Sequence, residues 1–144
     1  MVHVEVHGHV LVITLDRPEV RNAIDAATSR EIEAAIDRLE DDAALRVGVL
    51  THTGPVFCAG ADLKAIAREG LRGIETERGG FAGLCRRERT KPLVVALEGA
   101  AVGGGLEIVL ASDIVVASTA VRFALPEVQR GLVALSGGTF RLAR

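Results

Sequence analysis

Alternating hydrophobic and polar residues near the start of the chain predict a β-hairpin. Val2, Val4 and Val6 alternate with polar residues, and a second apolar run, VLVITL at 10–15, follows Gly8. A period of two places alternate side chains on opposite faces of a strand, and a short link containing glycine favours a hairpin. We therefore expect strands at 2–7 and 10–15, the second of them closed by Arg17-Pro18.

A helical period follows the hairpin. Apolar residues recur at i, i+3, i+4 and i+7, namely Ile32, Ala35, Ile36 and Leu39. This spacing places them on one face of a helix that packs against the core. Two residues compete for the N-cap: Asp25, and Thr28 as the first residue of a capping box with Glu31. The polar end of the helix begins at Asp41-Asp42.

The rest of the chain alternates between apolar runs and helical patterns. Residues 69–80, with glycines among charges, predict a mobile surface segment, and residues 99–105 predict a glycine-rich turn. Repeated alternation of strand and helix is typical of one α/β domain with a partly parallel sheet. The further elements expected are strands at 46–51, 93–97, 113–117 and 121–125, and helices at 64–68, 81–88 and 106–111.

Composition and charge argue against several classes of function. The 144 residues are 49% hydrophobic, carry a formal net charge of −2, and include four Phe but no Tyr or Trp. Nucleic-acid-binding domains generally have a basic face and aromatic side chains on which bases stack. We therefore expect no nucleic-acid partner.

Cysteine usage and hydropathy point to a cytoplasmic protein. The two cysteines, Cys58 and Cys85, form no CxxC pair, which favours a reducing compartment. The most apolar stretch, 93–117, is interrupted by charged residues and contains no uncharged run of the ~20 residues that span a bilayer. The N-terminus lacks the basic region and cleavage site of a signal peptide. We expect no membrane association.

Two glycine-containing turns follow apolar strands. CAGAD, at 58–62, comes after strand 46–51, and GGGLE, at 103–107, comes after strand 93–97. Parallel strands place such turns at one edge of the sheet, and glycine lets the backbone approach a ligand closely. Converging N–H groups from the two turns would form an oxyanion hole, whereas the alternative is ordinary turn geometry. Neither turn matches the phosphate-binding or dinucleotide-binding glycine patterns.

Two glutamates are candidates for acid/base chemistry, one at the end of the second turn and one further along the chain. Glu107 is in the first turn of an apolar helix, and Glu127 follows Pro126 at the end of a short strand. Taken singly, Glu107 suits the helix dipole and Glu127 suits the surface. As a pair beside an oxyanion hole they indicate general acid/base chemistry, and partial burial would raise a carboxyl pKa towards the working pH.

Four segments together resemble the crotonase superfamily, the enoyl-CoA hydratase/isomerase family. They are ITLDRPEVRNAID (13–25), FCAGADLK (57–64), KPLVVALEGAAVGGGLEIVLASDIVVAS (91–118) and FALPEVQRGL (123–132). The resemblance covers essentially the whole chain. It implies an α/β fold of the crotonase type, a spiral of stacked ββα units, with residues 1–144 as its core domain.

The resemblance also implies a site and a reaction. The backbone N–H groups of Ala61 and Gly104 match the oxyanion donors, and Glu107 and Glu127 match the two acid/base glutamates that add water across C2=C3 of a 2-enoyl-CoA. Coenzyme A enters as part of the substrate, and no separate cofactor or metal is implied. The residues matching substrate or CoA contacts are Arg21, Ala23, Ala59, Ala61, Asp62, Leu63, Lys64, Gly103, Gly104 and Pro126.

Other activities remain open beside hydration. The alternatives are an enoyl-CoA isomerase, another crotonase-type lyase, or a catalytically silent acyl-CoA-binding homologue. Hydratases of the family continue past the segment represented here by 137–142, with a helical part that covers the acyl pocket and builds much of the subunit interface. The resemblance implies a homo-oligomer, a trimer or a hexamer, and a chain without that helical part.

Several residues have alternative interpretations. His3, His7 and His9 could bind a metal with Glu5, although a solvated strand face is the simpler interpretation. Cys58 could be a nucleophile, although a small buried side chain is favoured because no motif places a histidine to activate it. His52 is a further candidate site residue. Asp62 is interpreted as structural rather than catalytic.

Overall fold

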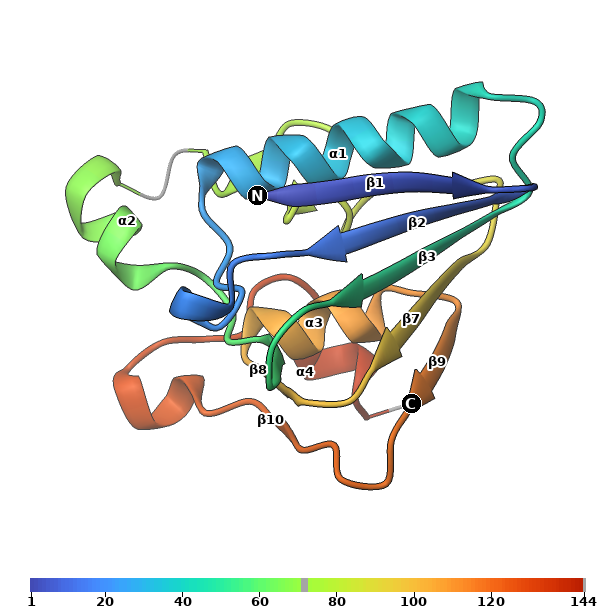
Figure 1. Cartoon of the computed structure of the whole chain (residues 1–144). Coiled ribbons are helices and arrows are strands. Elements are labelled where there is room, and N and C mark those ends of the chain that lie inside the picture. The colour runs from blue at the N-terminus through green and yellow to red at the C-terminus, as the bar shows by residue number, and fades with distance from the viewer. Residues whose placement is uncertain (71–72, 144) are drawn as a thin grey trace.

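A five-stranded sheet forms the larger layer of the molecule in the computed structural model, which describes residues 1–70 and 73–143. Its order is β1-β2-β3-β7-β9, with β1 (Val2–His7) antiparallel to β2 (Val10–Leu15). Strands β3 (Val47–His52), β7 (Leu93–Leu97) and β9 (Ile114–Ala117) run parallel to β2. The expected hairpin and the partly parallel sheet are both confirmed (Figure 1).

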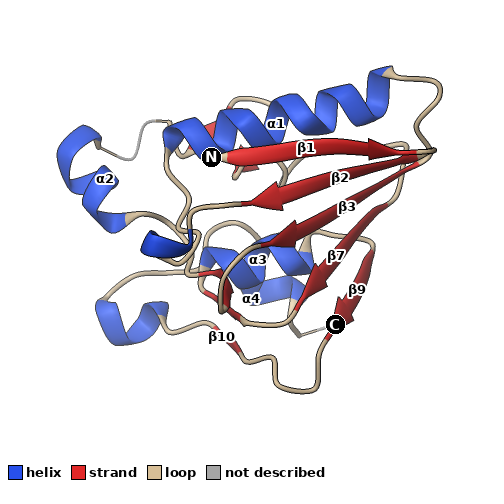
Figure 2. Cartoon of the chain, viewed as in Figure 1, coloured by secondary structure: helices blue, strands red, loops and turns tan. Residues whose placement is uncertain are grey.

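Strict alternation of buried side chains fixes how this sheet faces the core. Leu11, Ile13 and Leu15 of β2 are buried, and so are Leu93, Val95 and Leu97 of β7. Helix α1 (Ala26–Asp41) supplies the facing apolar stripe, since Ile32, Ala35, Ile36 and Leu39 are all buried as expected. Figure 2 shows α1 running alongside β1 and β2.

The N-cap of α1 is Asp25. Its carboxylate accepts hydrogen bonds from the N–H and the hydroxyl of Thr28, both at 2.8 Å. Thr28 is therefore at the third helical position, and the alternative capping box beginning at Thr28 is wrong. Asp42 ends the helix.

A second sheet, not expected from the sequence, joins the two glycine turns. Strands β4 (Val56–Cys58), β8 (Ala100–Val102) and β10 (Phe123–Ala124) pair in parallel in the order β10-β8-β4. The predicted turn at 99–105 therefore contains a strand, and the predicted strand at 121–125 shortens to two residues. Helix α3 (Gly104–Leu110) follows β8 directly and is packed against it (Figure 1).

The segment from 69 to 88 departs most from expectation. Residues 71–72 lie outside the described part of the chain, but Ile74, Gly79 and Gly80 are buried, so the surface placement expected for 69–80 is wrong for them. The expected helix at 81–88 is absent from the described residues. Ala82 and Gly83 have φ values of +56° and +65°, which an α-helix does not allow.

Short elements complete the described chain. Helix α2 (Leu63–Glu69) follows the first glycine turn, and β5 (Glu75–Thr76) pairs with β6 (Gly80–Phe81). Two 3₁₀ turns, η1 (Pro18–Val20) and η2 (Glu127–Arg130), and helix α4 (Gly138–Arg141) account for the rest. No described helix is both long and apolar enough to cross a membrane.

Most of the exposed large apolar side chains lie after residue 113. Strand β9 is an edge strand, and its Ile114, Val115 and Val116 are 54%, 43% and 59% exposed. Exposed apolar edge strands are ordinarily covered or paired. The others in this part of the chain are Phe123, Val128, Leu132, Val133, Leu135, Phe140 and Leu142.

The burial of α1 makes a prediction about stability. We expect Leu39→Ala, at a fully buried position, to lower the free energy of unfolding by about 2–5 kcal/mol because it leaves a cavity. The matched change Leu135→Ala, at a position that is 83% exposed, should alter it by less than about 0.5 kcal/mol. Urea unfolding followed by circular dichroism measures both, and equal losses would contradict the assignment of α1 to the core.

Candidate active site

The start of α3 packs directly on the backbone of β4. A Cβ added to Gly105 would lie 2.2 Å from the Cys58 carbonyl oxygen, and one added to Gly104 would lie 2.5 Å from the Phe81 ring. Gly103 has φ +58° and donates its N–H to the Ala124 carbonyl at 2.9 Å. Close packing therefore excludes a side chain at Gly104 and Gly105, and the positive φ favours glycine at position 103.

The second glycine turn lies against the first. Gly60 has φ +91°, and a Cβ there would lie 3.0 Å from the Gly104 nitrogen. The two turns are thus adjacent, as expected, although β4 and β8 rather than β3 and β7 bring them together. The predicted oxyanion donors, Ala61 and Gly104, consequently lie on neighbouring stretches of backbone.

Both predicted donor N–H groups are free of protein acceptors among the described residues. Ala61 forms a parallel bridge with Ile24, in which Ile24 donates to the Gly60 carbonyl and accepts from the Asp62 N–H, both at 2.8 Å. In a parallel bridge of this kind the N–H of the central residue points away from its partner. The N–H of Gly104 is the first of α3, where no carbonyl precedes it in the helix.

Glu107 is buried and fixed by a distant part of the chain. Its side chain lies in the first turn of α3 and is 4% exposed. Its Oε1 accepts hydrogen bonds from the backbone N–H groups of Ser136, at 2.6 Å, and Gly138, at 2.9 Å. The loop before α4 therefore orients this carboxylate. Glu107 is thus buried and hydrogen-bonded by tertiary contacts, which a favourable position in the helix dipole does not by itself explain.

Glu127 lies against Gly103, the first glycine of the second turn. It follows Pro126, begins η2 and is half-buried. Its Oε1 would be 3.0 Å from a Cβ on Gly103, and its Oε2 is buried without a hydrogen-bond partner among the described residues. A buried oxygen without a protein donor is costly unless another group donates to it. This oxygen is therefore available to a proton of a substrate or of water.

The segments predicted to contact CoA lie together. The Ala59 N–H donates to the Arg21 carbonyl at 3.0 Å, so residues 21–24 run beside residues 59–62. Arg21 and Lys64 are exposed, and Leu63 is 50% exposed. Ala23 is buried. That these residues bind CoA stays a prediction.

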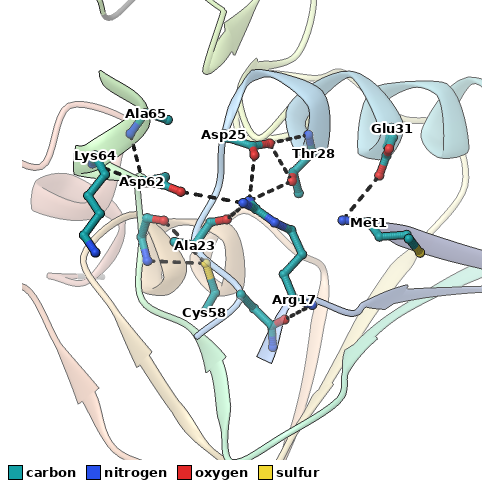
Figure 3. Close-up of polar contacts among 12 residues, drawn as sticks. Met1, Arg17, Ala23, Asp25, Thr28, Glu31, Cys58, Asp62, Lys64 and Ala65 are labelled. Carbon is teal, nitrogen blue, oxygen red and sulfur yellow. Dashed lines mark hydrogen bonds and ion pairs between the residues drawn. The ribbon is translucent and has the colours of Figure 1, made fainter. Parts of the chain in front are cut away.

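Asp62 has a structural role, as interpreted from the sequence. Its Oδ1 caps α2 by accepting from the N–H groups of Lys64 and Ala65, at 3.1 and 3.0 Å (Figure 3). Its Oδ2 lies 3.6 Å from an Nη of Arg17. Both oxygens are thus engaged by the protein.

Both cysteines are unsuited to nucleophilic catalysis. Cys58 is fully buried, and burial raises the pKa of its thiol to about 12, even though the Gly60 N–H donates to the sulfur. Burial and the nearby negative charge of Glu107 also raise the pKa of the Cys85 thiol. The nucleophile alternative for Cys58 is wrong, and the small buried side chain is confirmed.

The histidines of the first strand have separate partners, with His7 lying 3.9 Å from Glu5, and the described residues contain no group of three potential metal ligands. His3 pairs with Asp16 at 2.8 Å and His9 contacts the Ala44 carbonyl at 2.7 Å, so the two have separate partners. His52 stacks edge-on against Phe57 and lines a hollow of about 630 Å³ at the ends of β3, β7 and β9. The other residues around it are Thr51, Gly54, Ala96, Leu97, Glu98, Val116, Ala117 and Ser118, which include none of the predicted site residues.

Three residues beside the site were not singled out from the sequence. Asn22 is 2% exposed, accepts from the Arg17 N–H, and donates to the carbonyls of Thr53 and Val56, which fastens residues 17–24 to the β3–β4 loop. Arg17 and Phe81 contact the two glycine turns. Arg17 and Asn22 lie in the segment 13–25 that carries the family resemblance, but their contacts with Asp62, Thr53 and Val56 join residues more than 30 positions apart, which local patterns do not predict. Only Asn22, at φ +52°, is a residue type enriched in the left-handed region.

Comparison with known proteins identifies the fold. The chain superimposes on an enoyl-CoA hydratase from Mycobacterium tuberculosis H37Rv with a TM-score of 0.92 and 47% identity, over 99% of this chain and 55% of that one. A carnitinyl-CoA hydratase from Mycobacterium avium matches with a TM-score of 0.93 and 45% identity, over 99% and 55%. The architecture is therefore that of the crotonase fold.

The sequence comparisons agree. Residues 5–144 match the family model described as enoyl-CoA hydratase/isomerase, and the chain belongs to that family. It is 49% identical to a mevalonyl-coenzyme A hydratase from Aspergillus fumigatus, over 94% of this chain and 51% of the relative. It is 46% identical to a carnitinyl-CoA dehydratase from Proteus mirabilis, over 99% and 55%. The chain thus spans about half the length of these relatives.

The burial of the thiols predicts their reactivity. In the folded protein at pH 8 we expect neither Cys58 nor Cys85 to react with a disulfide reagent, because both are buried and their thiol pKa values are raised. In guanidinium chloride both should react at the rate of a free thiol. Absorbance of the released thiolate measures each, and rapid labelling of the native protein would contradict the burial.

Proposed function

We propose that this chain carries the catalytic centre of a hydratase of the crotonase type, which adds water across C2=C3 of a 2-enoyl-CoA thioester or removes it in reverse. The observation that carries the proposal is the arrangement where the two glycine turns meet: two backbone N–H groups without protein acceptors among the described residues, and two carboxylates beside them. The names of two relatives, a mevalonyl-coenzyme A hydratase and a carnitinyl-CoA dehydratase, support the same class of reaction.

Each group has a role in the proposed reaction. The N–H groups of Ala61 and Gly104 donate to the thioester oxygen, which withdraws electrons from C3 and stabilises the enolate. The carboxylates of Glu107 and Glu127 together take a proton from the attacking water and deliver one to C2. The oxygen of water bonds to C3 and a proton bonds to C2, so the C2=C3 double bond becomes a single bond and the product contains all the atoms of the substrate and one water. Coenzyme A takes part as the substrate's carrier group, with Arg21 and residues 59–64 beside it.

Isosteric substitution of the carboxylates tests the proposal. We expect Glu107→Gln and Glu127→Gln each to lower kcat for hydration of crotonyl-CoA by about 10²–10⁴-fold, because a carboxamide cannot transfer the proton. Loss of absorbance of the conjugated thioester measures the rate. Glu88→Gln, at an exposed residue, is the matched control and should leave the rate unchanged. Unaltered rates in the two site variants would contradict these roles.

Two further measurements separate the alternative functions. Conversion of a 3-enoyl-CoA into its 2-enoyl isomer without hydration would favour an isomerase. A folded protein that binds CoA thioesters in calorimetry but converts neither substrate would favour a silent acyl-CoA-binding homologue.

A further inference from the structure

Arg17 lies where two helices and the first glycine turn meet. The residue follows β2 in the chain, and its side chain is 18% exposed. One Nη donates to the Ala23 carbonyl at 2.7 Å and lies 2.9 Å from an oxygen of Asp25, while the other lies 3.6 Å from Asp62 (Figure 3). One guanidinium thus contacts the carboxylates of two different elements.

These two carboxylates are the N-caps of separate helices. Asp25 caps α1 and Asp62 caps α2. Burial would raise the pKa of Asp25, but hydrogen bonds from Thr28 and the positive charge of Arg17 lower it overall. The carboxylates of both N-caps therefore lie beside the Arg17 guanidinium, which is the cation between them.

The contact extends to the predicted oxyanion donor. Ala61 is flanked by Gly60 and Asp62, and both neighbours are hydrogen-bonded to Ile24. Arg17 contacts this ladder on both sides, at the Ala23 carbonyl and at Asp62. Without the guanidinium, two partly buried carboxylates would face each other without a cation, which favours their separation. Moving Asp62 away would carry the Ala61 N–H with it.

We propose that Arg17 is a positioning residue that sets the direction of the Ala61 N–H towards the thioester oxygen. The inference rests on the proposed function, since it assigns Ala61 as an oxyanion donor. A misplacement of about 1 Å at such a group can lower a rate by about 10²-fold. Lysine would not replace Arg17, because a single ammonium lacks the planar fork that reaches two carboxylates and a carbonyl at once.

Two variants of Arg17 and one control test the inference. We expect Arg17→Met and Arg17→Lys to lower kcat for crotonyl-CoA hydration by about 10–100-fold, with KM changed by less than about threefold. Arg30→Met, at an exposed position of α1, should match the wild type in kcat and KM. Equal kcat in the Arg17 variants and the wild type would overturn the proposal.

A spectroscopic measurement separates positioning from a loss of stability. The carbonyl stretch of a ¹³C-labelled crotonyl-CoA thioester falls in frequency when strong donors bind its oxygen, and a smaller folded fraction does not change the frequency of the bound form. We expect the shift on binding to be smaller in both Arg17 variants than in the wild type. A full shift in these variants would overturn the proposal even if kcat fell.

A gentler variant decides the matter if the Arg17 variants do not fold. Asp62→Asn keeps a residue that caps helices well but removes the charge facing Arg17. We expect a fall in kcat of about two- to fivefold and a reduced carbonyl shift, because a partly exposed ion pair contributes only a small free energy. An unchanged kcat and an unchanged shift would overturn the proposal.

The proposed function and this inference fail in different ways. A wild-type protein that neither hydrates crotonyl-CoA nor shifts its carbonyl band would overturn the function itself. A wild type that hydrates, with Arg17 variants that hydrate equally well, would overturn only the role of Arg17. If the wild type binds the thioester without hydrating it, the carbonyl shift still tests the position of the Ala61 N–H.

Discussion

The direct packing of α3 on the backbone of β4 is the constraint on which the site depends. Gly105 lies against the Cys58 carbonyl, and Gly60 lies against the Gly104 nitrogen. Side chains at these positions would force the two turns apart. Because the backbones touch, N–H groups from turns more than 40 residues apart in the chain lie close together. The parallel pairing of β4 with β8 brings the two backbones into this contact.

The carboxylates are brought to this contact from other directions. Glu107 is carried by α3 itself but is oriented by the N–H groups of Ser136 and Gly138, and Glu127 approaches from η2 against Gly103. The site is therefore assembled from segments near residues 60, 104, 127 and 137. Since Arg17 and Asn22 fasten the first of these segments from the N-terminal side, most of the chain contributes to its geometry.

Local sequence patterns identified the elements with long, strong periods. The four apolar positions of α1 and the alternation of β1 and β2 specify their own structure, because each buries one regular face. The helix that local patterns predicted at 81–88 is wrong, because Ala82 and Gly83 adopt left-handed conformations there. A Cβ on Gly83 would lie 2.5 Å from the Ser29 carbonyl, so packing against α1, not local preference, decides the path there. The N-cap of α1 was also open from the sequence, because both Asp25 and Thr28 are residue types that suit the position.

The amino-acid sequence by itself determined the family, the two glycine turns and the identities of the four groups proposed to act on the substrate, because these are carried by motifs of fixed residue types and spacing. The tertiary structure decided what surrounds them: the second sheet that joins the turns, the N–H donors that orient Glu107, the burial that raises the pKa of the Cys58 thiol, and the place of Arg17 between two helix caps. Each of these depends on contacts between residues far apart in the chain, which local patterns of hydrophobicity and conformational preference do not encode.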